Sequence, residues 1–268
     1  MKVGESCGAR HGYLAGTDDV RAADINRFFA DDEVDAIFCI RGGYGAARIV
    51  PLLNYDVIRN HPKLFLGYSD VTALHSALNR YGHLVTFHGP NGDISIEDDR
   101  VAVSFQSLMQ ALTATDGYEI MNPAGYPRQT LQGGIAWGRL TGGNLTVLAH
   151  SLGTPWAPDF EGKILFIEDI GEHTYRVDET LVNLKYAGAF EKCAGILLGE
   201  FTDCPVEYPD YGFTLEEVLE EIGFPENKPV LRGIRAGHCS PKLTLPMGVL
   251  CEMDADRKTV RLLEGPVE

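Results

Sequence analysis

The chain has 268 residues, a formal net charge of −15 and a hydrophobic content of 44%. This length allows one large or two medium domains. The acidic balance argues against a nucleic-acid partner, because such binding needs clustered Lys and Arg, and here the positive residues are scattered. No apolar run approaches the ~20 residues that cross a bilayer, and residues 1–12 lack the apolar core of a secretory signal. We therefore expect a cytoplasmic protein without a membrane partner.

The six cysteines are spread along the chain without a C-x-x-C pair. This pattern suits a reducing compartment and argues against a structural zinc site or a disulfide scaffold. Cys39 and Cys193 lie in or beside apolar segments and are interpreted as small core residues. The role of Cys239, which directly follows His238, is left open by the sequence.

The first part of the chain alternates helix and strand signals. Short apolar runs bounded by turns indicate buried strands, and between them the apolar spacing is that of helices, with Asp18 or Asp19 as a cap of the first. This alternation predicts a parallel sheet with helical crossovers. The predicted strands cover 35–40, 63–67 and 84–88, and the predicted helices cover 20–30, 46–53, 70–80 and 99–112.

The second half of the chain has a different pattern of apolar runs and turns. Residues 113–135, which precede most of it, are rich in Gly, Pro and Thr, and this composition indicates a linker or a domain crossing. We therefore predict an N-terminal domain over 1–115, and a linker with a second α/β domain over 116–268. In the second domain, apolar runs between tight turns predict strands over 138–148, 163–169, 194–201 and 244–254, with helices near 174–187 and 214–222.

A strand-to-helix turn at Gly67-Tyr68-Ser69-Asp70 carries the most information in the sequence. Such a turn lifts a serine hydroxyl out at the positive end of a helix, where turn amides can stabilise a developing oxyanion. The general elbow is G-x-S-x-G, and here Val71 stands at its last position. From the turn alone, Ser69 is either a nucleophile or a helix N-cap.

The glycine-rich turn at 42–45 resembles a dinucleotide site only in part. Aligned to G-x-G-x-x-G, it places Arg48 at the third glycine, and Phe65 stands where an acidic residue is expected about 20 residues further on. We therefore disfavour NAD and interpret the turn as a source of backbone N–H donors at the sheet edge, with a plain strand-to-helix turn as the alternative.

A serine nucleophile needs a base, and the base needs an orienting carboxylate. His238 lies in a glycine-flanked turn between two predicted strands, while His88 ends a strand of the first domain and competes for the role. Glu168 stands where an apolar strand ends, which favours it as the carboxylate. Nearby alternatives for the carboxylate are Asp169, Glu172 and Asp178.

Six segments together resemble the LD-carboxypeptidase family (peptidase family S66), whose members are serine peptidases that trim murein peptides in the bacterial cytoplasm. The similarity runs over essentially the whole chain. It implies a Rossmann-like N-terminal domain, a C-terminal swivelling β/α domain and an active site between them. The segments are RGGYGAAR (41–48), LGYSDVTALH (66–75), TFHGP (86–90), LTGGNL (140–145), FIEDIGEHTYRVD (166–178) and GHCSPKLTLPMG (237–248).

The resemblance implies a triad of Ser69, His238 and Glu168, without a metal or organic cofactor. Release of terminal D-alanine from a murein tetrapeptide is the implied reaction, and the implied assembly is a homodimer. For the oxyanion we expect the amides of Gly43 and Asp70 as donors. The candidates for contact with a substrate carboxylate or amine are Arg176 and Asn144, with a structural role as the alternative for each.

One departure from the family pattern concerns the N-terminus. Family members usually begin about forty residues earlier, with a strand, a helix and a second strand, so we expect the first unit to be missing and the neighbouring Ile37 and Phe38 to be exposed. Three alternatives to murein trimming stay open at this point. They are an immunity peptidase that cleaves a peptide–nucleotide antibiotic with the same triad, a nucleotide-binding module, and a non-catalytic remnant.

Overall fold

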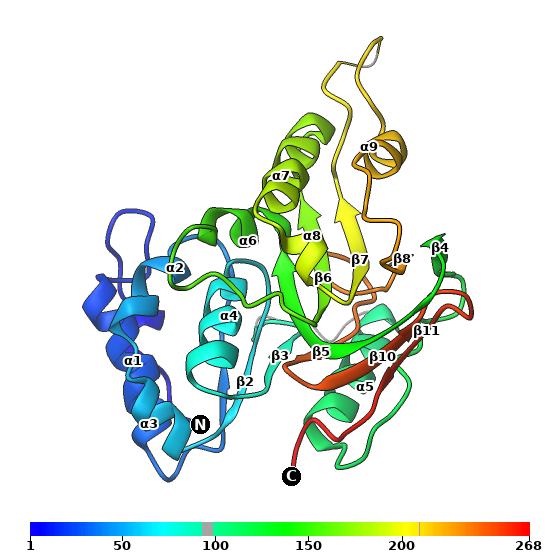
Figure 1. The fold of residues 1–268 in the computed structure, drawn as a ribbon. Coiled ribbons are helices and arrows are strands. Elements are labelled where there is room, and N and C mark those ends of the chain that lie inside the picture. Colours follow the sequence, from blue (N-terminus) through cyan, green and yellow to red (C-terminus); the bar gives the residue numbers. More distant parts are fainter. Residues whose placement is uncertain (93–98, 209) are drawn as a thin grey trace.

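The computed structural model describes residues 1–92, 99–208 and 210–268, and it contains two β-sheets with helices packed against both (Figure 1). The smaller sheet has the strand order β1-β2-β3-β9, and the larger has the order β11-β10-β5-β6-β7-β8-β4. The predicted α/β class is confirmed. None of the described helices is long and apolar enough to cross a bilayer.

The smaller sheet is built from β1 (Ala36–Phe38), β2 (Leu64–Gly67), β3 (Thr86–His88) and β9 (Leu245–Met247). The first three strands are parallel, as predicted, whereas β9 pairs antiparallel with β3. Because β9 lies after the boundary predicted near residue 115, the smaller sheet includes a strand from the second half of the chain. At the open edge of this sheet, Ile37 is nevertheless buried, while Phe38 is exposed.

Both faces of the smaller sheet are covered by helices, and alternate residues of β2 show it. Phe65 belongs to the apolar cluster formed with α1 (Asp18–Ala30) and α4 (Thr72–Tyr81). Leu66, the next residue, belongs instead to the cluster that contains Leu108 of α5 (Asp99–Thr113). Successive side chains of a strand point to opposite faces, so β2 is buried on both sides, as parallel strands usually are.

In the first 60 residues, the helices differ in length and number from those predicted, for local reasons. Thr17, rather than Asp18 or Asp19, caps α1, because its side chain accepts the Val20 N–H at 3.5 Å. The helix predicted over 46–53 is only α2 (Ala46–Ile49) followed by a 3₁₀ turn over Val50–Leu52, since Pro51 has no N–H to continue the helix. The short helix α3 (Tyr55–Asn60) was not predicted, and a 3₁₀ turn over Glu5–Cys7 precedes α1.

The larger sheet has a parallel centre and antiparallel edges. Strands β5 to β8 pair in parallel, whereas β10 pairs antiparallel with β5 and β11, and β4 pairs antiparallel with β8. The strands are β4 (Gln129–Gln132), β5 (Ile135–Asn144), β6 (Ile164–Ile170), β7 (Gly195–Thr202), β8 (Val230–Arg232), β10 (Leu250–Asp254) and β11 (Thr259–Leu262).

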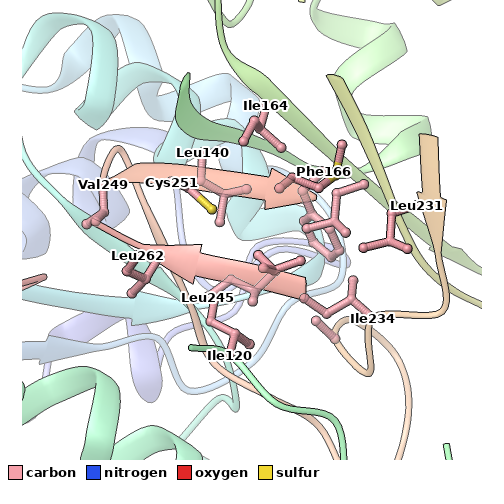
Figure 2. Packing of buried hydrophobic residues seen from close by; sticks show 14 of the residues in the cluster. Ile120, Leu140, Ile164, Phe166, Leu231, Ile234, Leu245, Val249, Cys251 and Leu262 are labelled. Atoms are coloured by element: carbon pink, nitrogen blue, oxygen red, sulfur yellow. The ribbon is translucent and has the colours of Figure 1, made fainter. Parts of the chain in front are cut away.

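The central strand β6 again divides its residues between two cores. Leu165 and Ile167 pack with the helices of this half, which Figure 1 shows together on one side of the sheet. Ile164 and Phe166 pack on the other face with residues of β9 and β10 such as Leu245 (Figure 2). The helices are α6 (Leu145–Ser151), α7 (Thr174–Tyr186), α8 (Ala189–Lys192) and α9 (Leu215–Glu221).

The strand predicted over 138–148 was wrong in its second part. It ends at Asn144, whose side-chain oxygen accepts the Val147 N–H at 3.1 Å and caps α6. The apolar, β-branched run after Asn144 therefore forms a helix, because the cap and the packing outweigh its strand preference.

The two sheets are joined by a direct hydrogen bond between α4 and β5, in which the Asn144 N–H donates to Thr72 Oγ1 at 3.0 Å. Within the smaller sheet, the Asn79 side chain of α4 donates to the Met247 carbonyl of β9 at 3.2 Å. An ideal Cβ on Gly143 would lie 2.4 Å from Thr72 Oγ1, so only glycine allows this close approach. Residues on either side of the seam are therefore held at fixed separation.

Candidate active site

The turn after β2 holds Ser69 in a strained conformation. Its φ is +67°, in the left-handed region that residues with a side chain seldom adopt, and a 3₁₀ turn (Ser69–Val71) leads from it into α4. Gly67 gives the strand room to turn, since an ideal Cβ there would lie 2.9 Å from Val71 Cγ1. The turn is also supported by the buried His75 of α4, whose Nε2 lies 2.9 Å from the Gly67 carbonyl oxygen. The sequence-predicted elbow is thus present.

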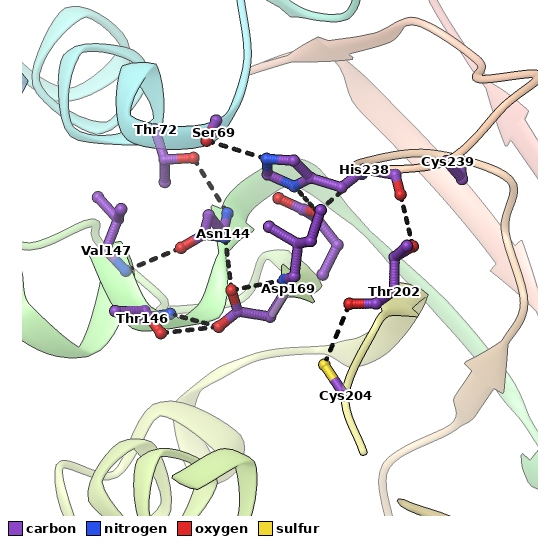
Figure 3. A network of polar contacts seen from close by, with 12 residues as sticks. Ser69, Thr72, Asn144, Thr146, Val147, Asp169, Thr202, Cys204, His238 and Cys239 are labelled. Carbon is purple, nitrogen blue, oxygen red and sulfur yellow. Dashed lines mark hydrogen bonds and ion pairs between the residues drawn. The ribbon is translucent and has the colours of Figure 1, made fainter. Parts of the chain in front are cut away.

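Ser69, His238 and Glu168 are connected by hydrogen bonds, although they come from distant parts of the chain. Figure 3 shows the contact between Ser69 and His238. Ser69 Oγ lies 3.0 Å from His238 Nε2, and His238 Nδ1 lies 2.7 Å from Glu168 Oε2. A carboxylate only accepts, so Nδ1 carries the proton and Nε2 is left to accept the serine hydroxyl. This is the arrangement in which an imidazole can remove a proton from an alcohol.

Glu168 is fully buried in β6, two residues before the strand ends at Ile170, and its Oε2 accepts from both the ring and the backbone N–H of His238, the latter at 3.0 Å. Gly237, with a φ of +99°, makes this double contact possible. An ideal Cβ on Gly237 would lie only 2.4 Å from Glu168 Oε2. The loop after β8 therefore binds the carboxylate closely and aims the imidazole at Ser69.

A cavity of about 310 Å³ opens at these residues. Of the predicted site residues it includes Ser69, His238 and Gly43, while Arg41 and Asn91 were not singled out from the sequence. Their positions in the sequence could have indicated a role in the site, because each residue lies in a loop that follows a strand of the parallel sheet, where ligands usually bind. The described residues that line the cavity are Arg41, Gly42, Gly43, Tyr68, Ser69, Asn91 and His238.

The glycine turn after β1 forms the wall of the cavity beside the nucleophile. An ideal Cβ on Gly42 would lie 2.7 Å from Ser69 Cβ, and Gly43 has a φ of +114°. The turn is tied to the elbow by the Asp70 carboxylate, which accepts the Ala46 N–H at 2.8 Å. Burial raises the pKa of Asp70 above its ordinary value. The two predicted donor residues, Gly43 and Asp70, are thereby linked on either side of Ser69.

The competing candidates for the base and the carboxylate, His88 and Asp169, are buried or bonded to partners outside the triad. His88 is fully buried between Tyr68 and Phe166, and burial lowers its pKa well below the ordinary 6.5. Asp169 is occupied by the Asn144 amide at 2.8 Å and by Thr146. Within the described part of the chain, the hydrogen bonds from Ser69 therefore lead only to His238 and Glu168.

Asn144 and Arg176 have structural partners. The buried Asn144 caps α6 and donates to Asp169, and it does not line the cavity. Arg176 is exposed on α7, where it pairs with Glu179 at 2.9 Å and lies over the Tyr175 ring. The structure supports the structural role for both residues, and a contact with substrate stays a prediction.

The thiol of Cys239 is unsuited to nucleophilic chemistry. Burial raises its pKa to about 12, so it stays protonated near neutral pH, and its Sγ lies 3.5 Å from the Pro241 carbonyl oxygen. In the ranges that the structure describes, no group of three His, Cys, Asp or Glu side chains is placed to hold a metal ion.

Comparisons with known proteins identify the family of the chain. Residues 1–89 match the family model of the LD-carboxypeptidase N-terminal domain, and residues 137–253 match that of the C-terminal domain. The chain is 41% identical to a probable murein peptide carboxypeptidase of Bacillus subtilis, over 100% of this chain and 84% of the relative.

Solved structures show the same fold. A muramoyltetrapeptide carboxypeptidase from Oxalobacter formigenes matches with a TM-score of 0.82 and 31% identity, over 96% of this chain and 88% of the other. The microcin C7 self-immunity protein MccF, a protein of Escherichia coli, matches with a TM-score of 0.88 and 28% identity, over 99% and 86%. An enzyme class thus replaces the two non-catalytic alternatives. The chain belongs to the LD-carboxypeptidase family and is a serine carboxypeptidase.

Proposed function

We propose that this protein is an LD-carboxypeptidase that releases the terminal D-alanine of murein tetrapeptides by means of Ser69, His238 and Glu168. The observation that carries the proposal is the continuous path from Ser69 Oγ through the imidazole to Glu168 Oε2, with links of 3.0 and 2.7 Å. The names of the Bacillus and Oxalobacter relatives support the murein peptide as substrate.

In the first half-reaction, Ser69 Oγ attacks the carbonyl carbon between the L-configured centre and D-alanine, while His238 Nε2 takes the hydroxyl proton. The tetrahedral intermediate collapses when His238 gives this proton to the departing amine of D-alanine, which leaves an acyl ester on Ser69. Water then attacks the ester, His238 takes a proton from the water and returns it to Ser69 Oγ, and the shortened peptide leaves. Glu168 stays ionised throughout and stabilises the imidazolium.

The oxyanion of each tetrahedral intermediate is stabilised by backbone N–H groups on both sides of Ser69. Gly43 lines the cavity, and the Asp70 N–H directly follows the nucleophile at the start of the 3₁₀ turn. Removal of one such donor typically costs about 3 kcal/mol of transition-state stabilisation.

Several broader features belong to this proposal. The residues before and after position 115 form two domains, of which the first supplies Ser69 and the second supplies Glu168 and His238. The enzyme acts in the cytoplasm on recycled murein peptides as a homodimer, and it requires neither a metal nor an organic cofactor. Size-exclusion chromatography with light scattering tests whether the protein is a dimer. An unchanged rate after treatment with EDTA tests whether the reaction proceeds without a metal ion.

The test of the reaction is release of D-alanine from a diaminopimelate-containing murein tetrapeptide by the purified protein. Ser69→Ala is expected to lower turnover by about 10⁴–10⁶-fold, because the nucleophile is lost while binding is retained. An unchanged circular dichroism spectrum and melting temperature serve as the folding control. Equal rates for the wild type and this variant would remove Ser69 from the mechanism.

A second candidate substrate is a peptide–nucleotide conjugate of the kind cleaved by immunity peptidases. The likeness to the microcin C7 self-immunity protein, whose solved structures include a complex with glutamyl sulfamoyl guanosine, favours testing it. We expect kcat/KM to be higher for the murein tetrapeptide than for an aminoacyl sulfamoyl nucleoside. The opposite order would assign this chain to the immunity type while leaving the triad in place.

A further inference from the structure

The cavity at Ser69 has an unusual charge for this protein. The chain carries a net charge of −15, yet among the residues that the structure describes the seven that line the cavity include an arginine and no carboxylate. Asp70, the nearest acid in sequence, points instead at the Ala46 N–H. A second cation is close, since Lys242 Nζ lies 3.7 Å from the centroid of the Tyr68 ring, which itself lines the cavity. The cavity of this acidic protein is therefore locally positive and suited to bind an anion.

Arg41 supplies the formal positive charge of the lining. It lies three residues after the end of β1, and its guanidinium lies along the glycine turn, with Nη2 3.6 Å from the position of an ideal Cβ on Gly43. In the described part of the chain, no hydrogen bond or ion pair holds this exposed guanidinium. Arg48, seven residues further on, is by contrast bound through Nε and Nη2 to Asp18. The planar donors of Arg41 are thus free to bind a ligand in the cavity.

We infer that Arg41 binds the terminal carboxylate of the peptide substrate and so restricts the enzyme to the last residue of the chain. The inference rests on the proposed function. A terminal carboxylate lies one residue beyond the scissile carbonyl, and one residue spans about 3.3–3.6 Å, so its partner must belong to the same cavity as Ser69. A guanidinium matches a carboxylate with two parallel N–H donors.

The position of Arg41 next to Gly43 gives the two anionic groups of the substrate separate partners. The Gly43 N–H stabilises the oxyanion that forms at the scissile carbonyl, and the guanidinium beside it neutralises the charge that is present throughout the reaction. An internal peptide bond lacks the second anion and leaves Arg41 without a partner, so it binds more weakly. Arg41 is therefore a specificity-determining residue for exopeptidase action.

The first experiment compares the murein tetrapeptide with the same peptide ending in D-alaninamide. For the wild type, we expect kcat/KM to be about 10²-fold higher for the free acid, which is the usual range for hydrogen bonds to a charged group. Arg41→Gln is expected to lower kcat/KM about 10²-fold for the acid while changing it less than about threefold for the amide. Arg41→Lys should recover part of the loss, since it keeps the charge but loses the fork.

Arg48→Gln is the matched control, because Arg48 lies in the same segment but binds Asp18 outside the cavity lining. It is expected to leave the ratio of acid to amide unchanged. If Arg41→Gln cleaves the acid as fast as the wild type does, or loses the same factor on both peptides, the assignment of Arg41 is overturned while the proposed function stands.

A binding experiment separates the two proposals if the tetrapeptide is not cleaved. A fluorophosphonate labels Ser69 covalently, and we expect free D-alanine, but not D-alaninamide, to slow the labelling of the wild type. Arg41→Gln should abolish this protection while it is labelled at the wild-type rate without amino acid. Protection without release of D-alanine from the tetrapeptide would overturn the proposed substrate and keep Arg41. Equal protection of both proteins would overturn Arg41.

Discussion

The two halves of the active site are held in place by different physical means. On one side, Ser69 lies in a strained turn of positive φ that is exposed to the cavity and supported by glycines. On the other, Glu168 is fully buried and is bound by two N–H groups of His238. The nucleophile thus depends on backbone geometry within a few residues, whereas the base and carboxylate depend on contacts between distant segments. The predictions below disturb each half and the seam between them.

Among the predictions that follow, the largest effect is expected in the buried half. Glu168→Gln keeps the shape of the side chain but removes the charge that stabilises the imidazolium and selects its tautomer, so turnover should fall about 10³–10⁴-fold. Release of D-alanine from the tetrapeptide measures this loss of turnover. Near-normal turnover would transfer the role to a neighbouring acid.

The strained half is tested by Gly42→Ala. The new Cβ would lie 2.7 Å from Ser69 Cβ and 3.0 Å from its Oγ, so either the nucleophile or the glycine turn must shift. Because misplacement by about 1 Å can cost 10²-fold, we expect kcat/KM to fall by about that factor. Gly8→Ala is the control, since Gly8 has a φ of −105° and nothing lies within 4 Å of its ideal Cβ. Equal activity of the two variants would contradict this account of the elbow.

The support beneath the elbow predicts a pH dependence of stability. Burial lowers the pKa of His75 from 6.5 to about 4. A depressed pKa in the folded state means that the unfolded chain takes up the proton first, so stability is complete above pH 6.5 and is lost as the pH falls toward 4. His75 alone should remove about 2 kcal/mol of the free energy of unfolding between pH 6.5 and pH 5.

Urea denaturation at a series of pH values measures this loss. His88 contributes with the same sign and Asp70 with the opposite sign, because burial lowers the pKa of the first and raises that of the second. The difference between the wild type and His75→Gln therefore isolates His75. If the two proteins lose the same free energy over this pH range, His75 is not buried in the neutral form.

The smallest expected effect is at the seam. Thr72→Val keeps the volume but removes the oxygen that accepts the Asn144 N–H, and an unsatisfied buried donor costs about 1–3 kcal/mol. We expect a lower melting temperature and a kcat/KM reduced by about tenfold, because Thr72 is three residues from Ser69 and Asn144 ends a strand beside Glu168. Thr72→Ser keeps the hydroxyl and should restore both values. A Val variant with full activity would show that the seam does not set the alignment.

Local sequence was sufficient where a few neighbouring residues decide the geometry. The elbow at Gly67–Ser69, the parallel strands before it and the strand that carries Glu168 were all predicted, although this strand runs on to Ile170. These predictions succeeded because turn chemistry and apolar runs act over short distances. The helix of α6 and the contribution of β9 to the smaller sheet were missed. In the first case a cap at Asn144 outweighed strand propensity, and in the second a strand pairs across more than 150 residues of chain.

What the sequence indicated by itself was the turn at Ser69 and, through six short segments, the family with the triad that the resemblance implies. What only the tertiary structure decided was that His238 rather than His88 lies beside Ser69, that Glu168 rather than Asp169 contacts this imidazole, and that Arg41 rather than Arg176 lines the cavity. The physical reason is that hydrogen bonds and charge interactions act over a few ångströms in space. Residues 69, 168 and 238 come within that range only after both sheets have packed and the seam has closed.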